Sequence, residues 1–248
     1  MSWPTRKATS SASCHRATCE DHVTSKFDRY VATLVAIWEA FAAAGGGEVT
    51  QEPGYVFARH PHPIFNNALL LQPDAAALVS IMARFQTAGE WAVWTCAHET
   101  ASVAAAAGLQ RDVTTTPMMA DLELSVPQTD ATIEPSIGDD PAIIAELNGL
   151  PASLVAGVEG LRATVVGGGT SGLLSFPHDD DLNISFVATR PDARRQGLAS
   201  AAVVAAMVGA RYEGLRTATL PATPMGLGLY QRLGFVPIGE WQEWTPTE

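Results

Sequence analysis

The residues best suited to chemistry lie in a basic glycine loop, Arg194 to Gly197, which the small residue Ala199 follows closely. The stretch before it, Asn183 to Thr189, is apolar and β-branched like a buried strand, and Leu198 to Arg211 has the length and composition of a helix. A strand that enters a helix through such a loop leaves unpaired N–H groups at the positive end of the helix dipole. The segment therefore predicts an anion site that a phosphate can approach without meeting a Cβ.

A second segment with chemical potential runs from Thr217 to Phe235 and reads as strand, turn and short helix. It contains Tyr230, four residues before Gly234. A phenol with a pKa of about 10 stays protonated at neutral pH, as a general acid must. The alternative interpretation of Tyr230 is a half-buried core aromatic that tethers the helix to the sheet. At this point both interpretations stay open.

Taken together, the two segments resemble the GNAT N-acetyltransferase superfamily, over about residues 130–248. Arg194-x-x-Gly197-x-Ala199 after an apolar strand is similar to the acyl-CoA pyrophosphate loop of that family. The segment from Thr217 to Phe235 is similar to its final strand–helix–strand unit, whose tyrosine faces the CoA sulfur. The resemblance implies an α/β fold with a mixed sheet, in which two neighbouring parallel strands splay apart to admit acetyl-CoA as the co-substrate.

The resemblance also implies roles for particular residues. Tyr230 would protonate the leaving thiolate, and the strand end at 187–189 would pair with the pantetheine arm and polarise the thioester carbonyl through a backbone N–H. The family often has Asn six or seven residues before the tyrosine, where this chain has Ala222-Thr223-Pro224, and Thr223 can still donate one hydrogen bond. The implied site consists of catalytic Tyr230 and the cofactor-binding residues Val187, Ala188, Thr189, Arg194, Arg195, Gln196, Gly197, Leu198, Ala199 and Thr223.

The general base is not identified by the sequence. An ammonium substrate must lose a proton before attack, through a carboxylate, a histidine or a chain of waters. Several candidates lie near expected strand ends, although the aspartates among them read mainly as a solvated turn: Glu134, His178, Asp179, Asp180 and Asp181.

Composition restricts the function classes. The chain has 248 residues, 47% hydrophobic, and a net charge of −11, which disfavours nucleic acid and favours cationic small molecules, basic peptides or simply solubility. Its apolar runs are too short for a membrane span, and three cysteines make no disulfide framework, so the expected location is cytoplasmic. Cys14, His15, Cys19 and His22 fit no common zinc spacing, so no metal is predicted.

The expected organisation is a disordered tail (1–26), a degenerate N-terminal GNAT-like domain (27–125) and a C-terminal GNAT acetyltransferase domain (126–248). In the N-terminal half we expect helices at 27–44, 73–88 and 101–107, strands at 55–59, 65–71 and 91–97, and an extended segment at 113–124 interrupted by Pro117. In the C-terminal half we expect a strand at 131–134, a helix at 141–150, a meander of strands at 161–166, 171–176 and 183–189, and a last strand at 235–244. Trp241 and Trp244, expected to be exposed on that strand, indicate a homodimer edge.

The two halves have a similar order of signals. Pro73-Asp74 resembles Pro191-Asp192, and Trp91 precedes Gly108 by 17 residues, as Thr217 precedes Gly234. Our hypothesis is an internal duplication whose first copy lost its CoA loop and its acid, since Ala104 stands where Tyr230 does. The generic spacing of strand and helix is the competing explanation.

The predicted function is transfer of an acetyl group from acetyl-CoA to a primary amine, by direct attack and without an acyl-enzyme. The alternative is an acyl-CoA-binding sensor or partner-docking module that keeps the cleft without catalysis. The sequence leaves the amine open among polyamines, aminoglycosides, amino acids and protein N-termini.

Overall fold

The computed structural model describes residues 17–124, 127, 136–138 and 140–247, and the expected strand at 131–134 lies outside them. The N-terminal half contains α1 (Ala17–Gly45), β1 (Glu48–Glu52), β2 (Tyr55–Arg59), β3 (Asn67–Leu70), α2 (Ala75–Phe85), β4 (Ala92–Thr95), α3 (His98–Ala106) and β5 (Gln110–Asp121). The C-terminal half contains β6 (Ser136–Gly138), α4 (Ala142–Leu147), β7 (Arg162–Val166), β8 (Ser171–His178), β9 (Asp181–Thr189), α5 (Leu198–Tyr212), β10 (Thr217–Ala222), α6 (Leu227–Arg232), β11 (Val236–Pro237) and β12 (Trp241–Thr245).

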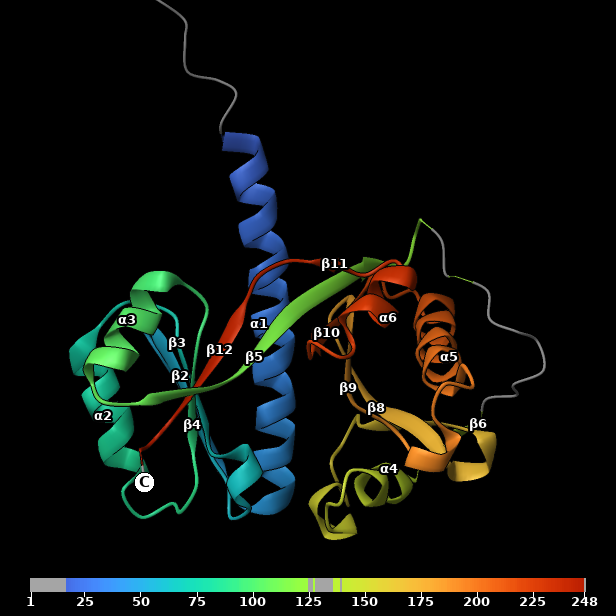
Figure 1. The fold of residues 1–248 in the computed structure, drawn as a ribbon, viewed down its shortest axis with the longest axis horizontal. Helices are drawn as coiled ribbons and strands as arrows, with labels where there is room; N and C mark the ends of the chain where they lie inside the picture. The colour runs from blue at the N-terminus through green and yellow to red at the C-terminus, as the bar shows by residue number, and fades with distance from the viewer. Residues whose placement is uncertain (1–16, 125–126, 128–135, 139, 248) are drawn as a thin grey trace, which may run out of the picture.

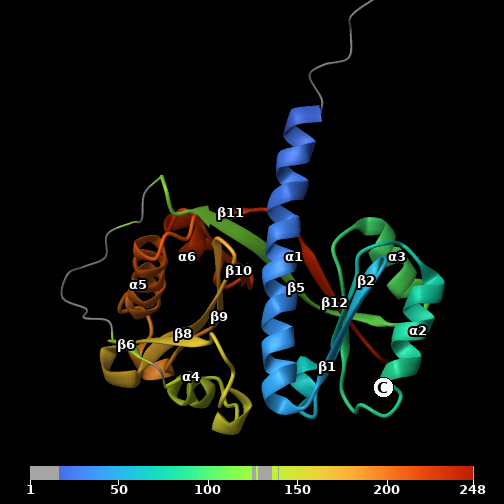
Figure 2. The same cartoon turned by 180° about the vertical axis from the view of Figure 1, so that it is seen from behind.

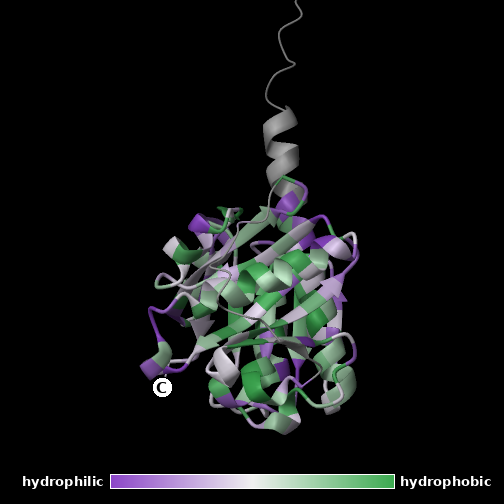
Figure 3. Cartoon of the chain, turned by 90° about the vertical axis from the view of Figure 1, so that its right-hand side faces the viewer, coloured by the Kyte–Doolittle hydropathy of each residue, from purple (hydrophilic) through white to green (hydrophobic). Residues whose placement is uncertain are grey.

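These strands form one mixed sheet in the order β1-β2-β3-β4-β12-β5-β10-β9-β8-β7-β6, with β11 paired to β5. Two lobes result, one around β1–β4 and the other around β7–β10, and α1 stands between them (Figures 1 and 2). The predicted mixed α/β fold and the predicted meander of β7, β8 and β9 are confirmed. Hydrophobic residues gather in the helices and strands of the body, and hydrophilic residues in the connecting loops (Figure 3).

Three boundaries differ from the sequence-based expectation. Helix α1 begins at Ala17, so residues 17–26 are helical rather than part of a tail. Strand β1 was not expected, because Glu48–Glu52 is polar and mostly exposed. The single strand expected over residues 235–244 is two strands, β11 and β12, separated at Ile238–Glu240.

Helix α1 joins the lobes because two apolar stripes run along it. Tyr30 and Trp38 pack with the core around Trp241 and Met119. Ile37 and Phe41 pack with Ile144 and Leu174 of the C-terminal half. A helix that is apolar on more than one side is buried between elements rather than laid on a surface.

The two halves exchange strands through β5 and β12. Strand β12 leaves the C-terminal half and inserts between β4 and β5 of the N-terminal half. Strand β5 pairs with β12 through residues 110–115 and with β10 through residues 116–121, and it runs through Pro117 without the expected interruption. The N-terminal half therefore receives β12 as the neighbour of its β4, and the C-terminal half receives β5 as the neighbour of its β10.

The halves repeat one topology. In β1–β2–β3–β4 and in β7–β8–β9–β10, two antiparallel pairs are followed by a parallel pair whose crossover contains a helix. Helices α3 and α6 then end in the same way, with Gly108 and Gly234 at φ of 84° and 87° and with the following N–H donated to Ala104 or Tyr230. The shared strand order supports an internal duplication.

The expectation of exposed tryptophans on the last strand is wrong. Trp241 is 2% exposed and Trp244 7% exposed, because β12 lies inside the sheet rather than at its edge. Trp241 packs against Phe27, Tyr30 and Trp94 with ring centroids 5.4, 5.9 and 6.4 Å apart. These residues fasten the C-terminal strand to the N-terminal half.

Trp241→Ala tests this exchange. We expect it to lower the free energy of unfolding by about 3–5 kcal/mol, because a large buried aromatic is removed from the contact between the halves. The measurement is urea denaturation followed by circular dichroism. Tyr212→Ala, at a residue that is 89% exposed, serves as the control and should change stability by less than about 0.5 kcal/mol. Equal effects of the two substitutions would contradict the buried role of β12.

Candidate functional site

The site begins where β9 and β10 part. The two parallel strands pair only over Asp181–Asn183 and Thr217–Thr219. Beyond these residues β9 continues beside β8 to Thr189, whereas β10 continues beside β5 to Ala222. A register shift between Gly172 and Leu174 and a φ of 50° at Phe186 accompany the divergence. The sheet is therefore open between Val187–Thr189 and the end of β10.

The glycine loop lies at the end of β9 and leaves its amides free. Arg195 and Gly197 have φ of 62° and 77°, and α5 begins at Leu198 with no side-chain cap. Among the described residues, the N–H groups of residues 195–200 have no hydrogen-bond acceptor, and the first helical bond is donated by Ala201. Free amides at the positive end of a 15-residue helix favour an anion.

The loop is held in place by its own polar side chains. Arg190 donates to both carboxylate oxygens of Asp192, at 2.7 and 3.0 Å, and this hydrogen bonding lowers the pKa of Asp192. Arg194 donates through Nε to the carbonyl of Thr189 at 3.2 Å, and Gln196 donates to the carbonyl of Asp192 at 3.5 Å. No ion pair of Arg195 is found within the described part of the chain.

Tyr230 lies at the other side of the opening. It is 8% exposed, its ring meets Phe235 edge-on with centroids 6.0 Å apart, and a Cβ at Gly226 would lie 2.8 Å from its Cε2. Burial raises the pKa of Tyr230 to about 12. With this pKa the phenol is protonated at neutral pH. No hydrogen bond of its hydroxyl is found to any described residue, so the proton is free to be donated.

One groove of about 1160 Å³ joins these features. Tyr230 and all the sequence-predicted cofactor residues except Gln196 line it: Val187, Ala188, Thr189, Arg194, Arg195, Gly197, Leu198, Ala199 and Thr223. Thr223 Oγ1 accepts a hydrogen bond from the N–H of Gly226 at 3.3 Å, which leaves its own proton available. Residues from the end of β9, the glycine loop, the turn after β10 and α6 are thus brought to one groove, as the resemblance implied.

The candidate bases named from the sequence lie elsewhere. Asp181 is fully buried at the far end of β9, accepts hydrogen bonds from Thr217 and Thr219, and has its pKa raised by burial. Asp180 is paired with Arg29 at 2.7 Å. His178 and Asp179 belong to the same hairpin turn, and Glu134 lies outside the described residues. None of the described four lines the groove.

Sequence reasoning missed one acidic residue that does line the groove, Glu146 on α4. Asn148 follows it, and its amide donates to the carbonyls of Ile144 and Phe186. No local motif marks Glu146. Only the way α4 packs across β8 and β9 brings it to the opening.

The matching place in the N-terminal half is closed. Strands β3 and β4 pair along their whole length, from Asn67–Ala92 to Leu70–Thr95. The carboxylate of Asp74 accepts from the N–H groups of Ala76 and Ala77 at 2.8 and 3.1 Å, so the amides at the start of α2 are already capped. Ala104 is buried in place of a tyrosine. No second opening of this kind is built here.

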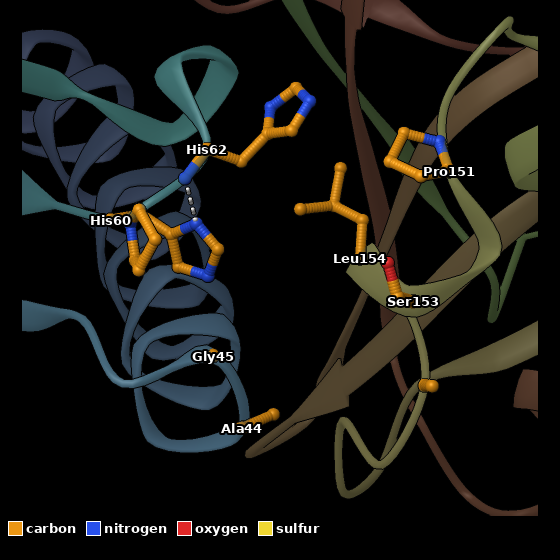
Figure 4. Close-up of a pocket in the computed structure, with 9 residues that line it drawn as sticks. Ala44, Gly45, His60, His62, Pro151, Ser153 and Leu154 are labelled. Carbon is orange, nitrogen blue, oxygen red and sulfur yellow. Dashed lines mark hydrogen bonds between the residues drawn. The ribbon is translucent and has the colours of Figure 1, made fainter.

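A smaller cavity of about 300 Å³ lies between the halves (Figure 4). The His60-Pro61-His62 turn faces Pro151, Ser153 and Leu154 across it, and the N–H of His62 donates to Nδ1 of His60 at 2.9 Å. Burial lowers the pKa of His60.

In the part of the chain that is described, no three His, Cys, Asp or Glu side chains form a metal-binding group, and no helix has the length and apolar character to cross a membrane. Cys14, His15, Cys19 and His22, which were expected to hold no metal, lie outside the described side chains.

An open parallel pair, a glycine loop at a helix N-terminus and a tyrosine across the opening define the class of acyltransferase-like mixed-sheet proteins. Residues 130–235 match the acetyltransferase (GNAT) family, so the C-terminal half of this chain carries a GNAT acetyltransferase domain. The match covers both predicted motifs.

Solved structures agree on the fold. A GCN5-related N-acetyltransferase from Kribbella flavida is 18% identical, with a TM-score of 0.65 over 86% of this chain and 95% of that one. A GCN5-related N-acetyltransferase from Sphaerobacter thermophilus is 14% identical, with a TM-score of 0.54 over 86% and 91%. A tandem GNAT protein from the clavulanic acid biosynthesis pathway is 13% identical, with a TM-score of 0.52 over 94% and 98%. The sequence matches no curated protein.

The environment of Tyr230 predicts a late phenol titration. Because burial disfavours the phenolate, the phenol of Tyr230 should stay protonated at pH 10.5 and lose its proton only near pH 12. The measurement is the difference in ultraviolet absorbance between wild type and Tyr230→Phe during an alkaline titration, with circular dichroism to verify folding. A difference signal with a midpoint at pH 10 would contradict the buried environment.

Proposed function

We propose that this protein is an acetyl-CoA-dependent N-acetyltransferase that acts on a primary amine by direct transfer. The observation that supports this most is the row of uncapped amides at residues 195–200, which opens into the same groove as the phenol of Tyr230. A closed seam between β9 and β10, or amides capped as in α2, would have removed the basis for the proposal.

The residues present fit acetyl-CoA. Gly197 and Ala199 leave the backbone accessible, and Arg194 and Arg195 line the groove beside the amides, so a pyrophosphate finds both N–H donors and positive charge. The unpaired edge of β9 at Val187–Thr189 offers backbone partners to an amide-containing arm. Acetyl-CoA supplies an activated acetyl group as a thioester.

The chain's own residues then have three tasks. The amides and arginines orient the co-substrate, and a backbone N–H at Val187–Thr189 polarises the carbonyl. The ammonium first loses a proton to solvent, and its nitrogen then bonds to the carbonyl carbon. As the bond from carbon to sulfur breaks, the nitrogen gives a second proton to water and becomes the amide nitrogen. Tyr230 gives its proton to the departing sulfur and regains one from water. Its raised pKa keeps the donor protonated before each turnover.

The location of the protein and the classes of its partners stay predictions. A cytoplasmic location rests on the cysteine usage, and the exclusion of nucleic acid and membrane partners rests on charge and composition. The prediction of a homodimer has no basis left, because Trp241 and Trp244, which were expected to be exposed, are buried. The alternative function is an acyl-CoA sensor, which would bind acetyl-CoA without transferring its acetyl group.

Ala199→Glu tests the anion site. A carboxylate in the first turn of α5 suits the helix dipole but repels a phosphate, so the helix should remain folded while acetyl-CoA binds at least about 10-fold more weakly. The measurement is isothermal titration calorimetry. Val208→Glu, at an exposed residue on the same helix outside the groove, should bind like wild type. Equal affinities of the two variants would exclude this loop as the phosphate site.

Tyr230→Phe tests the acid. We expect kcat to fall by about 100-fold or more, with the affinity for acetyl-CoA unchanged, because only the proton donor is lost. The measurement is thiol release from acetyl-CoA with a panel of amines, in wild type and variant. A wild type that binds acetyl-CoA and acetylates no amine supports the sensor instead. A variant as fast as wild type limits Tyr230 to packing.

A further inference from the structure

The groove passes through the sheet and has a different character on each side. Helices α5 and α6 pack on the face that contains Leu182, Ile184 and Ala218. Helix α4 packs on the opposite face, with Leu174 and Phe186, and it lies on the other side of β8 from α5 in both views (Figures 1 and 2). If the phosphates of the co-substrate lie against the N-terminus of α5, the α4 side is left for the acceptor.

Helix α4 presents one mixed face to the groove. Ile143, Glu146 and Leu147 line it at the spacing of a single helix face, whereas Ile144 and Ala145 are buried against the sheet. Met225, on the loop before α6, also lines the groove and is 89% exposed, and Ile143 is 36% exposed. Exposed apolar side chains around an opening indicate a partner with an apolar surface.

Glu146 is the one acidic side chain among the described lining residues of the groove. No ion pair of this carboxylate is found within the described residues, although Arg190, Arg194, Arg195 and Arg232 line the same groove. The amide nitrogen of Asn148 is already committed to two backbone carbonyls. The α4 side therefore offers a single free negative charge in apolar surroundings.

We propose that the acceptor is a primary amine carried on an apolar alkyl or aryl group, whose ammonium pairs with Glu146 while its body lies against Ile143, Leu147 and Met225. This inference rests on the proposed function and names its substrate class. Polyamines and aminoglycosides carry several charges or hydroxyls, for which this side has too few polar partners. An α-amino acid needs a cation for its carboxylate, and the Arg232 guanidinium lies back along α6, 3.6 Å from the Cβ position of Gly228.

The test compares 2-phenylethylamine and hexylamine with spermidine, kanamycin and L-phenylalanine as acceptors, by initial rates of thiol release. We expect kcat/KM for the two apolar amines to exceed that for the other three by at least about 10-fold. Glu146→Gln should raise KM for 2-phenylethylamine by about 10- to 100-fold and leave KM for acetyl-CoA unchanged, because a charge-assisted hydrogen bond is lost. Glu146→Asp should recover part of the loss.

Glu159→Gln, at an exposed glutamate outside the groove, is the matched control and should behave as wild type. Saturation-transfer NMR of 2-phenylethylamine with the protein–CoA complex adds a readout without turnover. Binding to wild type but not to Glu146→Gln supports the acceptor site even if no transfer occurs, and absent transfer then counts against the proposed function alone. Preference for spermidine, kanamycin or L-phenylalanine, equal KM values for Glu146→Gln and Glu159→Gln, or no amine binding in either assay would overturn the inference.

Discussion

The hydrogen bonds between β5 and β10 are the constraint on which the site depends. Beyond Thr219, β10 no longer pairs with β9, so only a strand on its other edge can hold the end of β10 in the sheet. Residues 116–121 of β5 do this along the whole of β10. Because β5 comes from the N-terminal half, the opening in the C-terminal half is built with a strand that this half does not possess.

This dependence gives the N-terminal half a structural task. Its strands repeat the wiring of the C-terminal half, yet its parallel pair is closed and Asp74 caps the amides of α2. The N-terminal half contributes β5 to the other half and contains β12 in its own sheet, where Trp241 and Trp244 of β12 complete the core of the N-terminal half. Helix α1 adds a polar attachment through Arg29 to Asp180 at the β8–β9 turn. The closed N-terminal half therefore helps to hold the open pair of the C-terminal half in place.

What could be predicted from the sequence was local. The loop from Arg194 to Gly197 is a short motif whose residue types follow from backbone needs. That it shares one groove with Tyr230 could be anticipated only through the resemblance to the GNAT family. The exchange of β5 and β12 could not, because an apolar strand reads alike at an edge and inside a sheet, and this led to the error on Trp241 and Trp244. Glu146 reads as an ordinary surface glutamate of a short helix. Its place beside the opening depends on packing across β8 and β9, which no spacing along the chain encodes.

The distribution of charge follows from a groove that crosses the sheet. Arginines gather where the free amides of α5 already favour an anion, and Glu146, the one carboxylate among the described lining residues of the groove, stands on the face of α4, beyond the opening. Under the proposed function, an anionic co-substrate and a cationic acceptor approach from opposite faces, so neither has to pass the charges that suit the other. They meet at the gap between β9 and β10, where Tyr230 is buried and protonated. Because burial disfavours the charged phenolate, it keeps the phenol of Tyr230 in its protonated form until the proton is donated.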